Sequence, residues 1–221
     1  MTEPLWTPSP ERVAATKMDA FRRSVGATAV AALHEWSVAN PSEFWQRIWD
    51  DCGVIGEPGD VIFDPGDGTV RGGRFFPQSG VSYAENALAP RAGAGEEAIV
   101  AITEAGERRS YTWAQLRSEV AAMSVALVAQ GVQPGDRVAA YMPHVAETII
   151  AFLAANAIGA TFTSTSSDFG VDGVVDRFGQ TTPTVLVAAD GYRYGGKSFD
   201  CLGRIAEVAA QLPSLKRTIV V

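Results

Sequence analysis

The sequence predicts an α/β fold, a mainly parallel sheet with flanking helices, preceded by a helical N-terminal extension. From residue 98 onward, apolar runs of strand length alternate with helical segments of roughly 10–15 residues, which is the pattern of βαβ units. Before residue 60, cap residues and apolar side chains recur at helical spacing. We therefore expect a helical extension at 1–60, a loop-rich connector at 61–97 and an α/β subdomain at 98–221.

The N-terminal extension carries start signals for several helices. Ser9-Pro10 is an N-cap followed by a first-turn proline, and it predicts a helix to about Val25. A second helix is expected over about 28–38, and Ser42 can cap a third. In this third helix, aromatic and aliphatic side chains at 44–49 are spaced i,i+4 and form one stripe. Such a stripe is more typical of core packing than of a ligand site.

The connector is rich in residues that favour turns. Gly, Pro and Asp separate short apolar runs over EPGDVIFDPGDGTVRGGRFFPQSG. Asp67-Gly68 is a two-residue hairpin signal between two of these runs. We expect loops here, with one hairpin.

The C-terminal region alternates strands and helices. Strands are expected at about 98–103, 108–112, 137–142, 160–165, 184–189 and 218–221. Helices are expected at about 112–130, 145–158, 171–179 and 200–211. Thr112 and Gln115 form a capping box at the start of the first of these helices, and Gly131 is suited to end it. The stretch GYRYGGKS at 191–198 is expected to be a loop after the fifth strand.

Composition and charge exclude several classes of protein. The formal net charge of −7 argues against a surface that binds nucleic acid over the whole domain. No apolar run approaches the roughly 20 residues that span a bilayer, and the N-terminus lacks the pattern of an export signal. Only Cys52 and Cys201 are present, so a disulfide framework is not expected. These features predict a cytoplasmic protein that binds neither nucleic acid nor membrane.

No metal site is expected. His34 and His144 have no Cys or carboxylate at ligand spacing. The chain stops at TIVV, inside an apolar strand, which suggests a truncated domain. An interrupted sheet would leave an edge strand exposed, and self-association of the truncated form is a possible result.

Gly191–Ser198, GYRYGGKS, matches the P-loop pattern G-x-x-x-x-G-K-[ST]. A strand before it and a helix after it favour the match. The bulky residues 192–194 argue against a tight phosphate nest, and no later strand ends in an Asp suited to Mg²⁺. Three hypotheses stay open for this stretch: a P-loop-type nucleotide-binding module, another phosphate site using Arg193 and Lys197, or a solvated basic loop.

Longer motifs resemble adenylate-forming acyl-CoA synthetases, in their N-terminal part. Residues 107–160 are similar to the family's opening block, including G-V-x-P-G-D-R-V and M-P-x-x-x-E. LHEWSVANPSEFWQRIWD at 33–50 and VSYAENAL at 81–88 resemble the acetoacetyl-CoA synthetase branch. So does SSDFGVDGVVDRFGQTTPTVLVAADGYRYGGKSFD at 166–200. The expected Trp and Cys are absent beside Ser166-Ser167.

The resemblance implies an AMP-forming acid–thiol ligase. ATP with Mg²⁺ would activate acetoacetate as an acyl-adenylate, and CoA would then displace AMP to give the thioester. Acetate or another short-chain acid is the alternative substrate. The family's ATP loop and catalytic Lys would follow residue 221, so this chain alone is expected to be inactive and to contain no catalytic residue or metal ligand.

The resemblance also implies which residues belong to a CoA site. In related acetyl-CoA synthetases, a Phe-Gly element and a basic loop contact the CoA nucleotide. These correspond here to Phe169, Gly170, Arg193 and Lys197. Two cations would suit the 3′-phosphate of CoA. The alternative for Phe169 is a place in the core.

Overall fold

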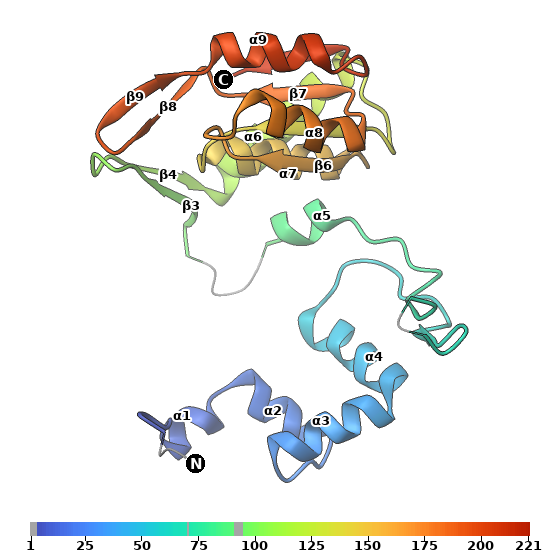
Figure 1. Cartoon of the computed structure of the whole chain (residues 1–221). Coiled ribbons are helices and arrows are strands. Elements are labelled where there is room, and N and C mark those ends of the chain that lie inside the picture. Colours follow the sequence, from blue (N-terminus) through green and yellow to red (C-terminus); the bar gives the residue numbers. More distant parts are fainter. Residues whose placement is uncertain (1–3, 70, 91–94) are drawn as a thin grey trace. The chain divides into compact units, whose positions relative to one another are not determined.

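The computed structural model describes residues 4–69, 71–90 and 95–221. The chain divides into two compact units, Met1–Val81 and Ser82–Val221, which are described separately below (Figure 1). The three-region division at residues 61 and 98 stays a prediction from sequence.

The first unit is helical, with one short strand pair. Its elements are α1 (Pro10–Ala14), α2 (Lys17–Ser24), α3 (Val30–Ala39), α4 (Pro41–Cys52), β1 (Phe63–Asp64) and β2 (Arg74–Phe75). Phe21, Trp36 and Phe44 contact one another edge to face, with ring centroids 6.0–6.3 Å apart. Trp49 packs on Phe76 at 4.8 Å. The aromatic stripe of α4 is therefore used for packing, as its spacing predicted, with Trp49 buried and Phe44 half-buried.

The first predicted helix is two helices. Ser9 caps α1 as expected, but this helix ends at Ala14. Thr16 is the N-cap of the next helix, α2, and its side chain accepts a hydrogen bond from the Asp19 N–H at 3.1 Å. The Thr16 hydroxyl also donates to the Val13 carbonyl at 2.8 Å. A Thr that bonds its neighbouring backbone in both directions starts a new helix rather than continuing the old one. The predicted cap at Ser42 is also wrong, because α4 begins at Pro41 with Asn40 as its N-cap residue.

The predicted connector hairpin has a longer turn than Asp67-Gly68. Strands β1 and β2 pair antiparallel, with Phe63 opposite Phe75. Their connection covers 65–73, where Gly68 has φ 78° and its N–H donates to the Pro65 carbonyl at 2.9 Å. The strand pair was expected, but its connection is not a two-residue turn.

The second unit holds the parallel sheet. Its helices are α5 (Tyr83–Leu88), α6 (Trp113–Ala129), α7 (Ala146–Ala157), α8 (Val171–Thr181) and α9 (Leu202–Gln211). Its strands are β3 (Glu97–Ile102), β4 (Arg108–Thr112), β5 (Arg137–Tyr141), β6 (Thr161–Thr165), β7 (Val185–Ala188), β8 (Gly191–Tyr194), β9 (Lys197–Asp200) and β10 (Arg217–Val220). The capping box of Thr112 and Gln115 forms as predicted.

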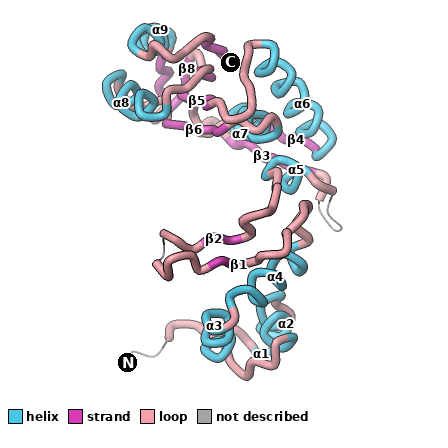
Figure 2. The backbone as a smooth tube through the Cα atoms, turned by 90° about the vertical axis from the view of Figure 1, so that its right-hand side faces the viewer, coloured by secondary structure: helices cyan, strands magenta, loops and turns pink. Residues whose placement is uncertain are grey.

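The central sheet has four parallel strands in the order β10-β7-β5-β6. Its two faces bury different helices, and Figure 2 shows α8 and α9 on one side with α6 and α7 on the other. Val138 and Ala140 of β5 point into the α6–α7 core, whereas Ala139 and Tyr141 point into the α8–α9 core. The predicted α/β class, with a parallel sheet buried on both faces, is confirmed.

The stretch 191–198 is a β-hairpin rather than the predicted loop. Strands β8 and β9 pair antiparallel, with Arg193 opposite Ser198, and Figure 1 shows the pair extending away from the sheet. Gly195 and Gly196, the two turn residues, have φ of 58° and 74°. Positive φ at both positions is what a two-residue type I′ turn requires, and glycine accepts it without strain.

This hairpin is incompatible with a P-loop. A P-loop runs directly from its glycines into a helix, whose first N–H groups face the phosphates. Here Lys197 and Ser198 are extended residues at the start of strand β9, and the rest of that strand and Cys201 lie between them and the start of α9 at Leu202. The hypothesis of a P-loop-type nucleotide-binding module is therefore wrong.

Candidate functional site at the carboxyl edge of the sheet

The loops after β5, β6 and β7 meet at one edge of the sheet, because these strands are parallel. The chain leaves β5 toward α7 on one face, and it leaves β6 toward α8 on the other. Two neighbouring strands whose connections go to opposite faces leave a crevice outside their carboxyl ends. Ligands of open α/β sheets bind at such points, so this edge is the candidate site.

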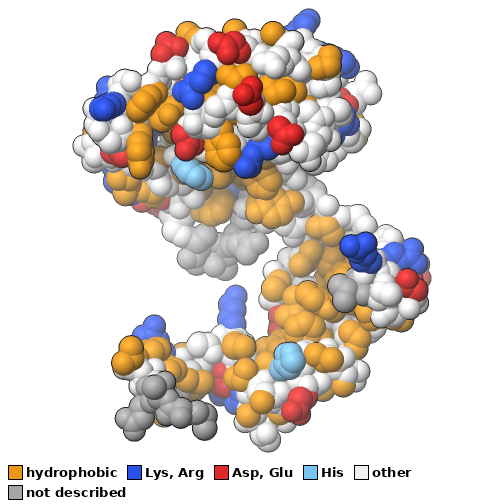
Figure 3. Space-filling model, viewed as in Figure 1, with side chains coloured by type: hydrophobic (Ala, Val, Ile, Leu, Met, Phe, Trp, Pro, Cys, Tyr) orange, Lys and Arg blue, Asp and Glu red, His pale blue; other side chains and the backbone are white. Residues whose placement is uncertain are grey.

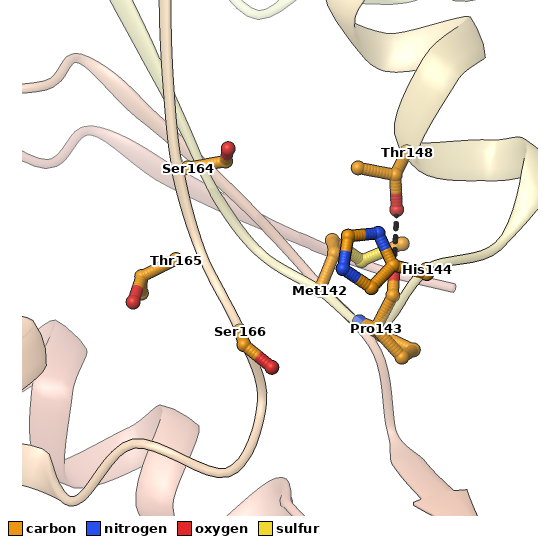
Figure 4. Close-up of a pocket in the computed structure, with 7 residues that line it drawn as sticks. All are labelled: Met142, Pro143, His144, Thr148, Ser164, Thr165 and Ser166. Atoms are coloured by element: carbon orange, nitrogen blue, oxygen red, sulfur yellow. Dashed lines mark hydrogen bonds between the residues drawn. The ribbon is translucent and has the colours of Figure 1, made fainter. Parts of the chain in front are cut away.

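A small cavity lies at this crevice. Its volume is about 150 Å³, and Figure 4 shows its lining by Met142, Pro143, His144, Thr148, Ser164, Thr165 and Ser166. The Thr148 hydroxyl donates to the Pro143 carbonyl at 2.8 Å, which holds the start of α7 against the end of β5. The Ser164 hydroxyl and the His144 imidazole can bond a small polar group. Sequence reasoning did not identify this cavity.

The loop between β6 and α8, residues 166–170, contains two of the predicted site residues. The Tyr141 hydroxyl lies 2.5 Å from the Phe169 carbonyl oxygen and 3.1 Å from that of Ser167. The Phe169 ring is partly buried against the α8–α9 core, and the Arg177 guanidinium lies over it at 4.4 Å. Gly170 is the N-cap residue of α8, and a Cβ added at this position would meet nothing within 4 Å.

Arg204 of α9 contacts the same loop. Its guanidinium donates to the Ser167 carbonyl at 3.1 Å and to the Tyr141 hydroxyl at 3.3 Å. It also lies 5.9 Å from the centre of the Tyr192 ring in the hairpin. Sequence reasoning missed Arg204. An Arg inside an otherwise amphipathic helix carries no local signal that it points toward a loop far away in the sequence.

The hairpin separates the two predicted cations. Side chains alternate between the faces of a strand, and directly opposed residues share a face. Tyr194 and Lys197 therefore lie on the face of the stacked Tyr192–Phe199 pair, whose ring centroids are 4.9 Å apart. Arg193 lies on the other face, opposite Ser198. The two cations are close in the chain but do not point the same way.

Several ionisable groups at this edge are perturbed. The Ser166 side chain donates to the Asp168 carboxylate and, with the nearby Arg204 charge, lowers the pKa of Asp168. Burial raises the pKa of the Tyr141 phenol, and it also raises the pKa of the Cys201 thiol at the start of α9. Figure 3 shows acidic and basic side chains interspersed over the visible face of this unit. Within and beside the hairpin, Asp190 and Asp200 accompany the two cations.

Glu147 lies near the start of α7, where the sequence resemblance has M-P-x-x-x-E. Its carboxylate accepts a hydrogen bond from Arg109 at 2.7 Å, and it lies 3.4 Å from the Tyr111 hydroxyl. It sits in the first turn of the helix, where a negative charge is favourable. This carboxylate is structural.

Metal ligands do not gather in the described part of the chain. Among residues 4–69, 71–90 and 95–221, no group of three or more His, Cys, Asp or Glu could hold a metal ion. Over the same residues, no helix is both long and apolar enough to cross a membrane.

The chain is similar to enzymes of a known family over most of its length. Residues 88–221 match the family model described as AMP-binding enzyme. The chain is 40% identical over 217 residues to the acetoacetyl-coenzyme A synthetase of Rhizobium meliloti, covering 95% of this chain and 33% of that protein. It is 35% identical to the acetoacetyl-CoA synthetase of Macaca fascicularis, again over 33% of the relative.

A solved structure is similar over the whole chain. The acetoacetyl-CoA synthetase from Streptomyces lividans superposes with a TM-score of 0.91 at 36% identity, covering 99% of this chain and 35% of that one. The chain thus spans about a third of the length of the relatives that it matches.

Proposed function

Because the chain belongs to the AMP-binding enzyme family, we propose that it is the N-terminal part of an acetoacetate–CoA ligase. The single observation that carries this proposal is the similarity to acetoacetyl-CoA synthetases over almost the full chain, in sequence and in fold. The whole protein would join acetoacetate to CoA and form AMP and diphosphate.

The proposed reaction has two steps. The carboxylate oxygen of acetoacetate attacks the α-phosphorus of ATP, and diphosphate leaves. The CoA thiol then attacks the carbonyl carbon of the acyl-adenylate, and AMP leaves with the bonding electron pair. Activation is required because a carboxylate is a poor acyl donor until its oxygen is part of a good leaving group.

Among the described residues, no group of three or more His, Cys, Asp or Glu could hold the Mg²⁺ that would accompany ATP. We assign no step through the ion to this chain. We propose instead that ATP and Mg²⁺ bind elsewhere in the full-length protein and that the 221 residues alone are inactive.

We propose that this chain contributes part of the CoA site. Phe169 and Gly170 would lie beside the nucleotide, and the hairpin that carries Arg193 and Lys197 would lie near its phosphates. The position of loop 166–170 at a crevice in the sheet supports this assignment. Because the two cations lie on opposite faces of the hairpin, we assign only one of them to the 3′-phosphate. We choose Arg193, because its planar fork can bind a phosphate through two parallel hydrogen bonds, and we give Lys197 a longer-range role.

The substrate is tested on the full-length protein. Diphosphate exchange into ATP that depends on acetoacetate, together with AMP formation that depends on CoA, is the expected result. A preference for acetate over acetoacetate would instead support the alternative, a ligase for another short-chain acid. Formation of ADP and phosphate would contradict both.

The CoA assignment is tested with CoA and dephospho-CoA, which lacks the 3′-phosphate. Arg193→Gln is expected to weaken the preference for CoA by about tenfold or more, because a hydrogen bond to a charged group contributes about 1.5–3 kcal/mol. Lys197→Gln is the matched variant from the other face and should have a smaller effect. Equal affinity of the wild-type protein for the two compounds would remove the assignment.

A further inference from the structure

Arg204 connects elements that are distant in sequence. Its guanidinium reaches the Ser167 carbonyl at 3.1 Å, the Tyr141 hydroxyl at 3.3 Å and the Cys201 sulfur at 3.3 Å. Its carbon atom Cζ lies 5.9 Å from the centre of the Tyr192 ring. One side chain therefore contacts loop 166–170, strand β5, the start of α9 and strand β8 of the hairpin.

These contacts depend on shape more than on charge pairing. In the described part of the chain, no Asp or Glu forms an ion pair with Arg204. Its guanidinium bonds a carbonyl oxygen, a phenol and a thiol and lies near an aromatic ring, and its charge also acts on the Asp168 carboxylate of loop 166–170. Arginine suits this arrangement because its planar fork donates in fixed directions while its face can lie against a ring.

The two segments that Arg204 joins are those assigned above to the CoA nucleotide. Loop 166–170 carries Phe169, whose carbonyl is bonded by the Tyr141 hydroxyl next to the Arg204 guanidinium. Tyr192 directly precedes Arg193 in the hairpin. A shift of Arg204 would therefore change the spacing between Phe169 and Arg193.

We propose that Arg204 is a positioning residue that holds loop 166–170 and the hairpin at a fixed separation and thereby sets the affinity for CoA. This inference rests on the proposed function. Arg204 itself does not need to touch the ligand. Formation of the acyl-adenylate, which precedes CoA binding, would not depend on it.

Arg137 provides a matched control. It donates from Nε to the Thr181 carbonyl at 2.8 Å and from a terminal nitrogen to the Thr182 carbonyl at 2.7 Å. It is thus another arginine that bonds loop carbonyls, but it lies at the start of β5, at the opposite edge of the sheet. Its loss should affect stability in a similar way without altering the candidate site.

The experiment compares Arg204→Gln, Arg204→Lys and Arg137→Gln in the full-length protein. Two quantities are measured: the KM for CoA in thioester formation, and acetoacetate-dependent diphosphate exchange into ATP. Arg204→Gln should raise the KM for CoA by about 10- to 100-fold, since small misplacements of binding groups have effects of this size. Exchange should change by less than about twofold. Arg204→Lys keeps the charge but not the fork, so it should also raise the KM.

A second readout follows the two segments directly. Amide hydrogen exchange without ligand should become faster in both 166–170 and 191–200 in Arg204→Gln, and in neither segment in Arg137→Gln. Faster exchange in both segments supports the joint positioning.

Several results would overturn the inference. An unchanged KM for CoA in Arg204→Gln, an equal rise in Arg137→Gln or full rescue by Arg204→Lys would each exclude a positioning role. A loss of diphosphate exchange in Arg204→Gln as large as its rise in the KM for CoA would exclude this role too. If the wild-type protein itself showed no CoA-dependent turnover, the proposed function would fail with it. An active wild type with an unaffected Arg204→Gln variant would sink only the present inference.

Discussion

Removing the Tyr141 hydroxyl should destabilise the second unit measurably. Tyr141 is 1% exposed, and its hydroxyl lies 2.5 Å from the Phe169 carbonyl oxygen and 3.3 Å from a terminal nitrogen of Arg204. In Tyr141→Phe the ring still fills its place in the core, but this carbonyl loses its donor. Leaving a buried acceptor without a partner costs about 1–3 kcal/mol. Since the carbonyl is only partly buried, we expect about 1–2 kcal/mol.

The free energy of unfolding is measured by urea denaturation. In a second experiment, hydrogen exchange is measured for the slowest amides in β5 and β7. With a denaturant dependence of about 2 kcal/mol per molar urea, the expected loss lowers the midpoint by about 0.5–1 M. Tyr111→Phe is the control, because the part-buried Tyr111 hydroxyl lies 3.4 Å from Glu147, a long contact that should contribute about 0.5 kcal/mol. If Tyr141→Phe were no less stable than Tyr111→Phe, the hydrogen bonds of the Tyr141 hydroxyl would not hold loop 166–170 in place.

Two further predictions concern the hairpin and the Cys201 thiol. Gly196→Val should loosen the hairpin by about 1–2 kcal/mol because its turn needs positive φ, whereas Gly195→Asn should preserve it. Amide hydrogen exchange over 191–200 should be faster in Gly196→Val than in Gly195→Asn. Equal exchange rates in the two variants would contradict a turn that needs positive φ at these positions. The folded protein keeps the Cys201 proton at a pH where the unfolded thiol loses it, so stability should fall as pH rises above about 8.5. The free energy of unfolding in urea, measured from below to above pH 8.5, should depend less on pH in Cys201→Ala than in the wild type. An identical pH dependence would refute a raised pKa for the Cys201 thiol.

The sequence predicted those parts of the fold whose interacting residues are close together in the chain. The helix from Thr112 was predictable because its cap and its partner Gln115 are three residues apart. The break at Thr16 was missed because a continuous run of helix-compatible residues conceals a side chain that bonds the backbone in both directions.

The candidate site shows the same limit. The parallel order of the strands follows from the alternation of strands and helices, and it places the loops at one edge. Arg204 was not predictable, because its partners Tyr141 and Ser167 lie 63 and 37 positions away. The stretch GYRYGGKS carried two competing signals. Its Gly-Gly pair between alternating aromatics favours a hairpin, and the P-loop pattern concealed that simpler interpretation.

Protection of the full-length protein by CoA tests the central claim most directly. Hydrogen exchange with and without CoA should show slower exchange in the loop at 166–170 and in the hairpin at 191–200, while the start of β5 around Arg137 stays unaffected. Protection that leaves both of these segments unchanged would contradict the assignment of the CoA site to this edge of the sheet.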